Sequence, residues 1–174
     1  GAGEMWVTSA SGVVRIDPTR NVVAATIRLG SDAGALAVSE GAVWAATASS
    51  VVHIDPRTNT IAARIALEHP PGWLVAQDRN VWAASGSDVV RLDTGADRVA
   101  ATIRLHHRPD WAVVSAHDLW VMSSTSDVVM KVDRRSDAVA STTKVGANPQ
   151  LLDAGPTGVW TADFDGGTVT RIPE

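Results

Sequence analysis

The stretch Gly41-Ala42-Val43-Trp44-Ala45-Ala46 decides the fold, because the chain repeats its pattern. Nine residues after its Trp comes His53-Ile54-Asp55-Pro56. The Trp recurs at intervals of 38, 38, 38 and 40 residues. The five repeat tryptophans are Trp6, Trp44, Trp82, Trp120 and Trp160. A fixed period of about 40 residues is the signature of a repeat architecture.

Each repeat reads as four short strands. In residues 33–70, the apolar segments 35–38, 43–46, 51–54 and 60–67 are separated by turn or polar residues. The segment Asp55–Asn59 has turn chemistry, because Pro presets φ and because Asp and Asn bond their own backbone. The last segment alternates with period two, as expected for a strand with one face in solvent. The inner segments are apolar almost throughout, which is typical of strands covered on both faces.

This organisation predicts an all-β chain and, within that class, a β-propeller of four-stranded antiparallel blades. No apolar period of about 3.6 residues supports a solenoid of helix pairs, and a β-sandwich lacks self-similarity. We expect a single domain over residues 1–174 with about 4.5 repeats of 38–40 residues. The units are approximately 1–32, 33–70, 71–108, 109–148 and 149–174, and the first and last of the five blades are incomplete.

Three segments carry a family resemblance: Gly41–Ala46, Val51–Pro56 and Asn59–Ile65. They resemble the propellers of the YVTN, NHL and virginiamycin B lyase-like group, and the resemblance extends over the whole chain. That group includes lyases, sensor domains and scaffolds, so the resemblance implies a fold and leaves the function open. It is compatible with an extracytoplasmic location. The residues themselves identify no compartment, and we expect no signal peptide within residues 1–174.

The bulk composition excludes several classes of function. Of the 174 residues, 45% are hydrophobic and 20% are charged, as in soluble globular proteins. The formal charge of −4 is small, and no basic patch suits nucleic acid. Without Cys there is neither a disulfide nor a thiolate metal site. No apolar run reaches the roughly 20 residues of a membrane span. We expect no cofactor, no nucleic-acid partner and no membrane span.

A basic residue, an aliphatic residue and usually an acidic residue follow each repeat Trp, and the basic residue stands nine or eleven positions after the Trp. The triplets are Arg15-Ile16-Asp17, His53-Ile54-Asp55, Arg91-Leu92-Asp93, Lys131-Val132-Asp133 and the altered Arg171-Ile172-Pro173. We interpret the charged members as a scaffold ladder that joins blades or fixes turns. His53 replaces Arg in this pattern and is expected to be structural.

Nearly all variation between repeats falls in the loops expected on one face of the propeller, and such variable loops usually carry the binding site. Trp73 and Trp111 stand nine residues before Trp82 and Trp120, where other units have Ala35 and Leu151. Either the two indoles form an aromatic platform for a ligand, or they pack between blades or plug the channel. The ligand-binding candidates of this face are Glu68, His69, Trp73, His106, His107, Arg108, Asp110 and Trp111.

Histidines in these loops suggest a second kind of site. His69, His106 and His107, with Glu68 nearby, form a candidate metal or acid–base site. The resemblance adds that virginiamycin B lyases use His and Glu with a divalent metal on a propeller face. No individual catalytic position matches this chain, so catalytic residues stay unknown. No metal is expected, and these three His are the only weak candidates.

Three hypotheses of function remain. The favoured one is a non-catalytic propeller scaffold or binding module that uses its loop-rich face for a ligand or protein partner. The alternatives are a metal-dependent, lyase-like enzyme that uses the His and Glu loop residues, and a propeller fragment that assembles with itself.

The strand count bears on the last alternative. The first unit has strands two to four and the last has strands one to three. Both ends therefore supply strands two and three, and neither end can complete the blade of the other. We therefore expect no self-closed monomer, but a homo-oligomer or a piece of a longer propeller that supplies the missing strands. The competing form is a five-bladed monomer with two three-stranded blades, in which Arg171, Pro173 and Glu174 blunt the last edge.

Overall fold

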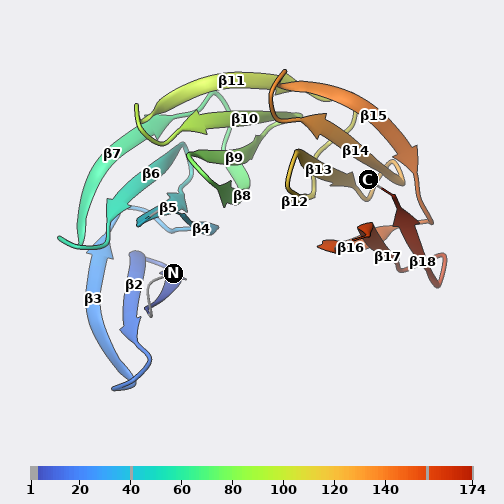
Figure 1. Ribbon diagram of the computed structural model, residues 1–174. Helices are drawn as coiled ribbons and strands as arrows, with labels where there is room; N and C mark the ends of the chain where they lie inside the picture. Colours follow the sequence, from blue (N-terminus) through green and yellow to red (C-terminus); the bar gives the residue numbers. More distant parts are fainter. Residues whose placement is uncertain (1–3, 40, 156, 174) are drawn as a thin grey trace. The chain divides into compact units, whose positions relative to one another are not determined.

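The computed structural model describes residues 4–39, 41–155 and 157–173, and these residues form strands, turns and loops only. Eighteen strands lie in five antiparallel sheets of three, four, four, four and three strands. Within each sheet the strands follow chain order (Figure 1). The number and order of strands in the described residues therefore match those expected from the sequence. None of these residues belongs to a helix that is long and apolar enough to cross a membrane.

The strands are short. Sheet 1 contains β1 (Met5–Ser9), β2 (Gly12–Asp17) and β3 (Val22–Arg28). Sheet 2 contains β4 (Leu36–Ser39), β5 (Ala42–Ala46), β6 (Ser50–Asp55) and β7 (Thr60–Ala66). Sheet 3 contains β8 (Pro71–Gln77), β9 (Asn80–Ser85), β10 (Asp88–Asp93) and β11 (Arg98–Arg104). Sheet 4 contains β12 (Trp111–Val114), β13 (Asp118–Ser123), β14 (Val128–Asp133) and β15 (Ala138–Lys144). Sheet 5 contains β16 (Pro149–Gly155), β17 (Gly158–Asp163) and β18 (Thr168–Ile172).

The chain forms two compact units. The first comprises the chain up to Gly86 together with Val90–Ala100, and it holds sheets 1 and 2 and most of sheet 3. The second comprises Ser87–Val89 and the chain from Ala101 on, and it holds sheets 4 and 5.

Consecutive sheets of the first unit pack through apolar faces. Val13 and Ile27 of sheet 1 share a cluster with Val43, Val52 and Ile54 of sheet 2. The other face of sheet 2 packs on sheet 3, in a cluster formed by Trp44, Val51, Ile65, Leu74, Val81 and Leu92. Sheet 2 is thus covered on both faces, which explains why its inner strands are apolar at nearly every position.

The second unit repeats this arrangement. Trp120, Met122 and Val129 of sheet 4 lie in one cluster with Leu152 and Val159 of sheet 5. In both units the repeat Trp belongs to the face that meets the following sheet.

Burial of the repeat Trp depends on that following sheet. Trp44, Trp82 and Trp120 are at most 1% exposed, whereas Trp160, in the last sheet, is 41% exposed. The prediction that the repeat Trp is buried between neighbouring sheets is confirmed for Trp44 and Trp120. It holds in part for Trp6, which is only partly buried against the cluster of sheets 1 and 2, and it is wrong for Trp160. The physical reason is that no later sheet among the described residues covers the indole of Trp160.

Four of the repeat tryptophans pair across their hairpins with the basic residue nine or eleven positions later. Trp6 pairs with Arg15 and Trp44 pairs with His53. The guanidinium of Arg15 lies 5.7 Å from the centre of the Trp6 ring, and the His53 ring stacks on Trp44 with a centroid distance of 4.4 Å. Cations over an indole face are stabilised by the ring quadrupole.

The basic residue also reaches the next sheet. Nη1 of Arg15 donates to the carbonyl oxygen of Pro56 at 2.8 Å and to Oδ1 of Asn59 at 3.0 Å. At the same repeat position, Nδ1 of His53 lies 2.8 Å from Oδ1 of Asp97. The predicted ladder thus joins sheets within the first unit, and His53 has the expected structural role.

The acidic residue of each of the first four triplets fixes its own turn. Oδ1 of Asp17 accepts from the backbone N–H groups of Thr19 and Arg20, and Asp55, Asp93 and Asp133 accept equivalent bonds. Each turn ends in a residue with positive φ, and these residues are Asn21 (54°), Asn59 (58°), Asp97 (50°) and Asp137 (53°). Asn and Asp tolerate this left-handed conformation better than other side chains, so the chemistry predicted for the turns is present.

The two terminal sheets each expose one apolar face. Met5 and Val23 of sheet 1 are more than half exposed, and so are Leu151 and Val169 of sheet 5. Strand β18 ends at Ile172, directly before Pro173, as the predicted blunting of the last edge requires. Glu174, the third residue of that prediction, lies outside the described residues.

A buried carboxylate holds sheet 5 together. Asp163 is 2% exposed, and its oxygens accept hydrogen bonds from the hydroxyls of Thr161 at 2.7 Å, Thr168 at 3.1 Å and Thr170 at 2.6 Å. Burial raises the pKa of Asp163, but the hydroxyls of Thr170, Thr161 and Thr168 and the N–H of Gly146 together hold this pKa below its ordinary value.

Asp163→Asn is expected to lower the free energy of unfolding at pH 7 by at least about 1 kcal/mol, because hydrogen bonds to a buried charge are lost. The folded-state pKa is lowered, so the contribution of Asp163 is complete above the unfolded carboxyl pKa of about 3.9 and is lost as the pH falls through the folded value. The free energy of unfolding, measured with urea across this pH range, should therefore fall less on acidification in the variant than in the wild type. Asp153→Asn, at an exposed position, is the control. An equal loss of stability with the same pH dependence in both variants would contradict the role assigned to Asp163.

Trp44→Ala is expected to lower the free energy of unfolding by about 3–5 kcal/mol, because a fully buried ring leaves a cavity. Trp160→Ala, at the same repeat position but without a covering sheet, should cost clearly less in dilute solution. Denaturant unfolding of both variants measures the difference. Similar losses at both positions would show that the following sheet does not determine the contribution of the Trp.

Candidate functional site

Three of the predicted ligand-binding residues lie in the first unit. Glu68 and His69 are exposed in the connection before β8, and the imidazole of His69 lies beside Gly86. The carbonyl oxygen of His69 accepts a hydrogen bond from the Ser85 hydroxyl at 3.2 Å. Trp73, on β8, is only 5% exposed, and its Nε1 has no hydrogen-bond partner among the described residues. Trp73 therefore presents little surface to a ligand.

The other five candidates lie together in the second unit, in the connection 105–110 and at the start of β12. Trp111 is 49% exposed. The Asp110 carboxylate beside it is fixed, because its Oδ2 accepts from the backbone N–H of Ser124 at 2.8 Å and from the Ser124 hydroxyl at 2.7 Å. Nε of Arg108 lies 3.8 Å from Asp110, and most of the Arg108 side chain is exposed. His106 is exposed and His107 is half-buried.

Equivalent sequence positions thus have different environments. Trp73 and Trp111 both stand nine residues before a repeat Trp, yet the first is buried and the second is not. Within the part of the chain that the structure describes, no group of three or more His, Asp or Glu side chains is arranged to hold a metal ion. The eight residues as one site remain a prediction.

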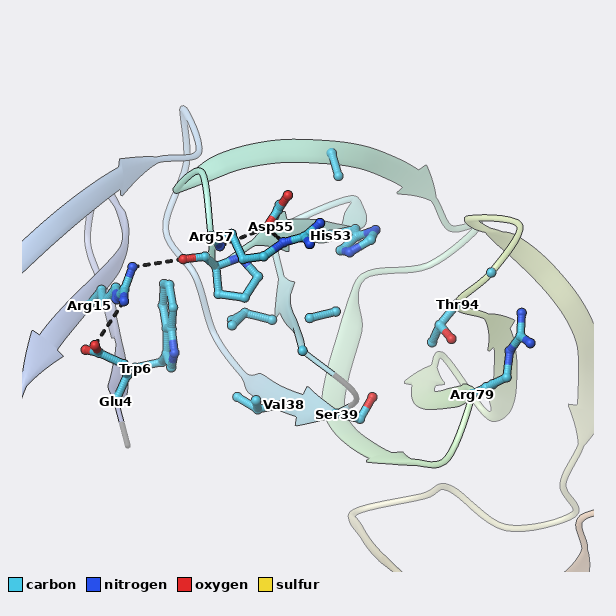
Figure 2. A pocket seen from close by; sticks show the side chains of 16 residues that line it. Glu4, Trp6, Arg15, Val38, Ser39, His53, Asp55, Arg57, Arg79 and Thr94 are labelled. Carbon is cyan, nitrogen blue, oxygen red and sulfur yellow. Dashed lines mark hydrogen bonds and ion pairs between the residues drawn. The ribbon is translucent and has the colours of Figure 1, made fainter. Parts of the chain in front are cut away.

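A pocket that sequence reasoning missed lies in the first unit, on the side of the Asp-Pro turns (Figure 2). It has a volume of about 1010 Å³. Its polar and aromatic lining comes from all three sheets of this unit and includes Glu4, Trp6, Arg15, His53, Arg57 and Arg79.

Most charges of this pocket are paired by the scaffold. Nη2 of Arg15 lies 2.9 Å from Oε1 of Glu4, and that contact, opposed by partial burial, raises the pKa of Arg15 above its ordinary value. The backbone N–H of Arg57 donates to Asp55 at 2.8 Å. This bond, against the opposing effect of burial, keeps the pKa of Asp55 below its usual range.

This pocket could have been located in the sequence from residues that differ from their counterparts in the other repeats. Arg79 stands where the preceding unit has Gly41, Gly95 stands where it has Arg57, and His53 stands where other units have Arg or Lys. All of these residues line the pocket.

The family model described as "Domain of unknown function (DUF5074)" matches residues 1–107. No curated protein sequence matches the chain.

Solved structures resemble the chain over nearly its whole length. Hydrazine synthase of Kuenenia stuttgartiensis matches with a TM-score of 0.80 and 16% identity, over 98% of this chain and 63% of that one. The Cps50 (Swd1) beta-propeller domain of Myceliophteria thermophila matches with a TM-score of 0.76 and 13% identity, over 91% and 58%. The computationally designed Ika8 protein matches with a TM-score of 0.81 and 14% identity, over 98% and 56%.

At such identities the likeness shows the fold alone, which is that of propeller-like repeats. The five sheets are consistent with propeller blades. The chain spans less than two thirds of the length of each of these three structures. The finer resemblance to the YVTN, NHL and virginiamycin B lyase-like group stays a prediction.

Proposed function

We propose that this chain, which belongs to the DUF5074 family, is a non-catalytic propeller module that binds a protein partner or a ligand through its variable loops. The similarity to propeller structures supports the scaffold part of this proposal. The binding part rests on one observation, which is the exposed indole of Trp111 beside a fixed carboxylate.

Trp111 has the properties of an interface anchor. Tryptophan and arginine are the residues most enriched among those that dominate protein–protein binding energy. Here a half-exposed indole stands next to Arg108, whose side chain is mostly exposed. Ser124 holds Asp110 from two donors, so the backbone that carries Trp111 is positioned before any partner arrives. Preorganisation of this kind lowers the entropic cost of binding.

The same proposal includes association of the chain through its terminal sheets, either with a second copy or with further sheets of a longer propeller. The support is internal repetition. The face of sheet 2 that carries Trp44 is covered by sheet 3, whereas the corresponding face of sheet 5, with Trp160 and Val169, is exposed. Exposed apolar patches beyond a few hundred Å² are rare on monomers (roughly 300–600 Å² is the usual maximum).

Trp111→Ala is expected to weaken the binding of a protein partner to this chain. Immobilised wild-type protein and the variant are compared for the proteins that each captures from an extract of the source cells, and Phe164→Ala, which alters another exposed aromatic, is the control. A partner bound by the wild type and by the control should bind the variant about thirtyfold more weakly, since loss of an anchor costs about 2 kcal/mol. Identical capture by all three proteins would remove Trp111 from the proposed site.

Association through the terminal faces is tested by sedimentation of the chain over a wide concentration range. The wild type should form species larger than 18.2 kDa. Val169→Glu, on sheet 5, and Met5→Glu, on sheet 1, should each sediment as single chains, because an unpaired charge is costly to bury. An equimolar mixture of the two variants should recover a dimer, because each still has one intact face.

A single 18.2 kDa species of the wild type at every concentration would contradict association with a second copy. Association that neither substitution affects would contradict the assigned faces.

A further inference from the structure

Three departures from the repeat converge on the turn-side pocket of the first unit. His53, Arg79 and Gly95 each replace the residue type of another unit, and all three line the pocket with Arg57 (Figure 2). Residues that only maintain a repeated scaffold tend to follow the repeat, and departures gather where repeat proteins bind.

His53 leaves space that a longer side chain would fill. At the same repeat position, Arg15 extends to Pro56 and Asn59 of the next sheet. The shorter imidazole of His53 remains stacked on Trp44, at an interplanar angle of 17°, and is held by Asp97. The contact to the next sheet is therefore kept with a smaller side chain.

Gly95 makes room for Arg79. A Cβ atom at Gly95 would collide with Nη2 of Arg79, so the guanidinium of Arg79 lies against the turn that follows β10. The equivalent turn residue in sheet 2 is Arg57, and the residue equivalent to Arg79 is Gly41. The two sheets thus each contribute one guanidinium to the pocket, from different positions of the repeat.

Arg57 and Arg79, two of the three arginines that line the pocket, are the groups that can hold an anion. Glu4 is bonded to Arg15, and Asp97, next to the lining, is bonded to His53. Asp55 accepts the backbone N–H of Arg57, and its contact with Nε of Arg57 is long, at 3.6 Å. The Arg57 side chain is 89% exposed, and Arg79 is also exposed. These two guanidinium groups retain most of their donors for a ligand, and planar guanidinium forks match carboxylate and phosphate oxygens.

We propose that this pocket binds a small anionic molecule whose carboxylate or phosphate oxygens are held by Arg57 and Arg79. The site uses other residues than Trp111, so it is a second binding function and does not depend on the proposed protein partner.

The experiment is a nuclear magnetic resonance titration of the wild-type chain with inorganic phosphate and, separately, with succinate. Saturable shifts of the Trp6 indole N–H and of the amides of residues 93–97 are expected for at least one probe. Comparison of the two dissociation constants distinguishes a phosphate ligand from a carboxylate ligand.

Three variants restore residues of the repeat and are therefore expected to keep the fold. Arg79→Gly introduces the residue of the preceding unit, Arg57→Thr introduces the equivalent of Thr19, and His53→Arg introduces the equivalent of Arg15. The first two should raise the dissociation constant by about tenfold each, because each removes charge-assisted hydrogen bonds. His53→Arg should weaken binding although it adds a positive charge, because its longer side chain fills the pocket.

Arg135→Thr is the matched control, because Arg135 occupies the turn position of Arg57 in sheet 4, outside the pocket. It should leave both dissociation constants unchanged. Absence of saturable shifts with both probes would overturn the inference. So would an equal loss of affinity in Arg135→Thr, which would indicate nonspecific attraction, or unchanged affinity in both Arg79→Gly and Arg57→Thr. Thermal unfolding of each variant establishes that it is folded, and if only one of Arg79→Gly and Arg57→Thr is folded, its dissociation constant decides.

Discussion

The packing of a repeat tryptophan against the following sheet is the contact on which the rest of the molecule depends. A single repeat of three or four short strands cannot bury its apolar faces alone, so each sheet depends on a neighbouring sheet. Trp44 joins sheet 2 to sheet 3, and Trp120 joins sheet 4 to sheet 5. Where the following sheet is absent from the described residues, as beyond Trp160, the same indole is partly exposed. Each repeat therefore contributes a sheet and also one side of the contact with the following sheet.

Polar contacts make this interface specific. In the first unit, Arg15 lies over Trp6 and bonds Pro56 and Asn59, and His53 lies on Trp44 and bonds Asp97. The acceptor is the left-handed residue that ends the next turn, because its side chain is presented at the sheet edge. One side chain thus links an indole, its own sheet and the next turn, which fixes the register between sheets as well as their contact.

Function in such a scaffold has to come from positions that depart from the repeat, because the repeated residues are occupied in holding sheets together. Trp111 is exposed although its counterpart Trp73 is buried. His53 replaces a longer cation, and the Arg79 and Gly95 pair inverts the Gly41 and Arg57 pair of the preceding unit. In the pocket, His53 keeps its contact with Asp97 of the next sheet, and Arg57 and Arg79 are exposed. These departures therefore change surface chemistry and leave that contact between sheets 2 and 3 in place.

The sequence by itself determined the strands, their order and the turns, because the spacing of Trp, the apolar segments and the Asp, Pro and Asn residues act within a single repeat. It also located Trp111 and Asp110 as candidates. Only the tertiary structure decided which indoles are buried, that Arg15 bonds Asn59, and that His53, Arg57 and Arg79 share a pocket. These contacts join residues from different sheets. The period of the repeat predicts that each sheet has a neighbouring sheet, but it does not predict which side chains of the two sheets are in contact. Burial at Trp160 depends likewise on a neighbouring sheet and not on local residues.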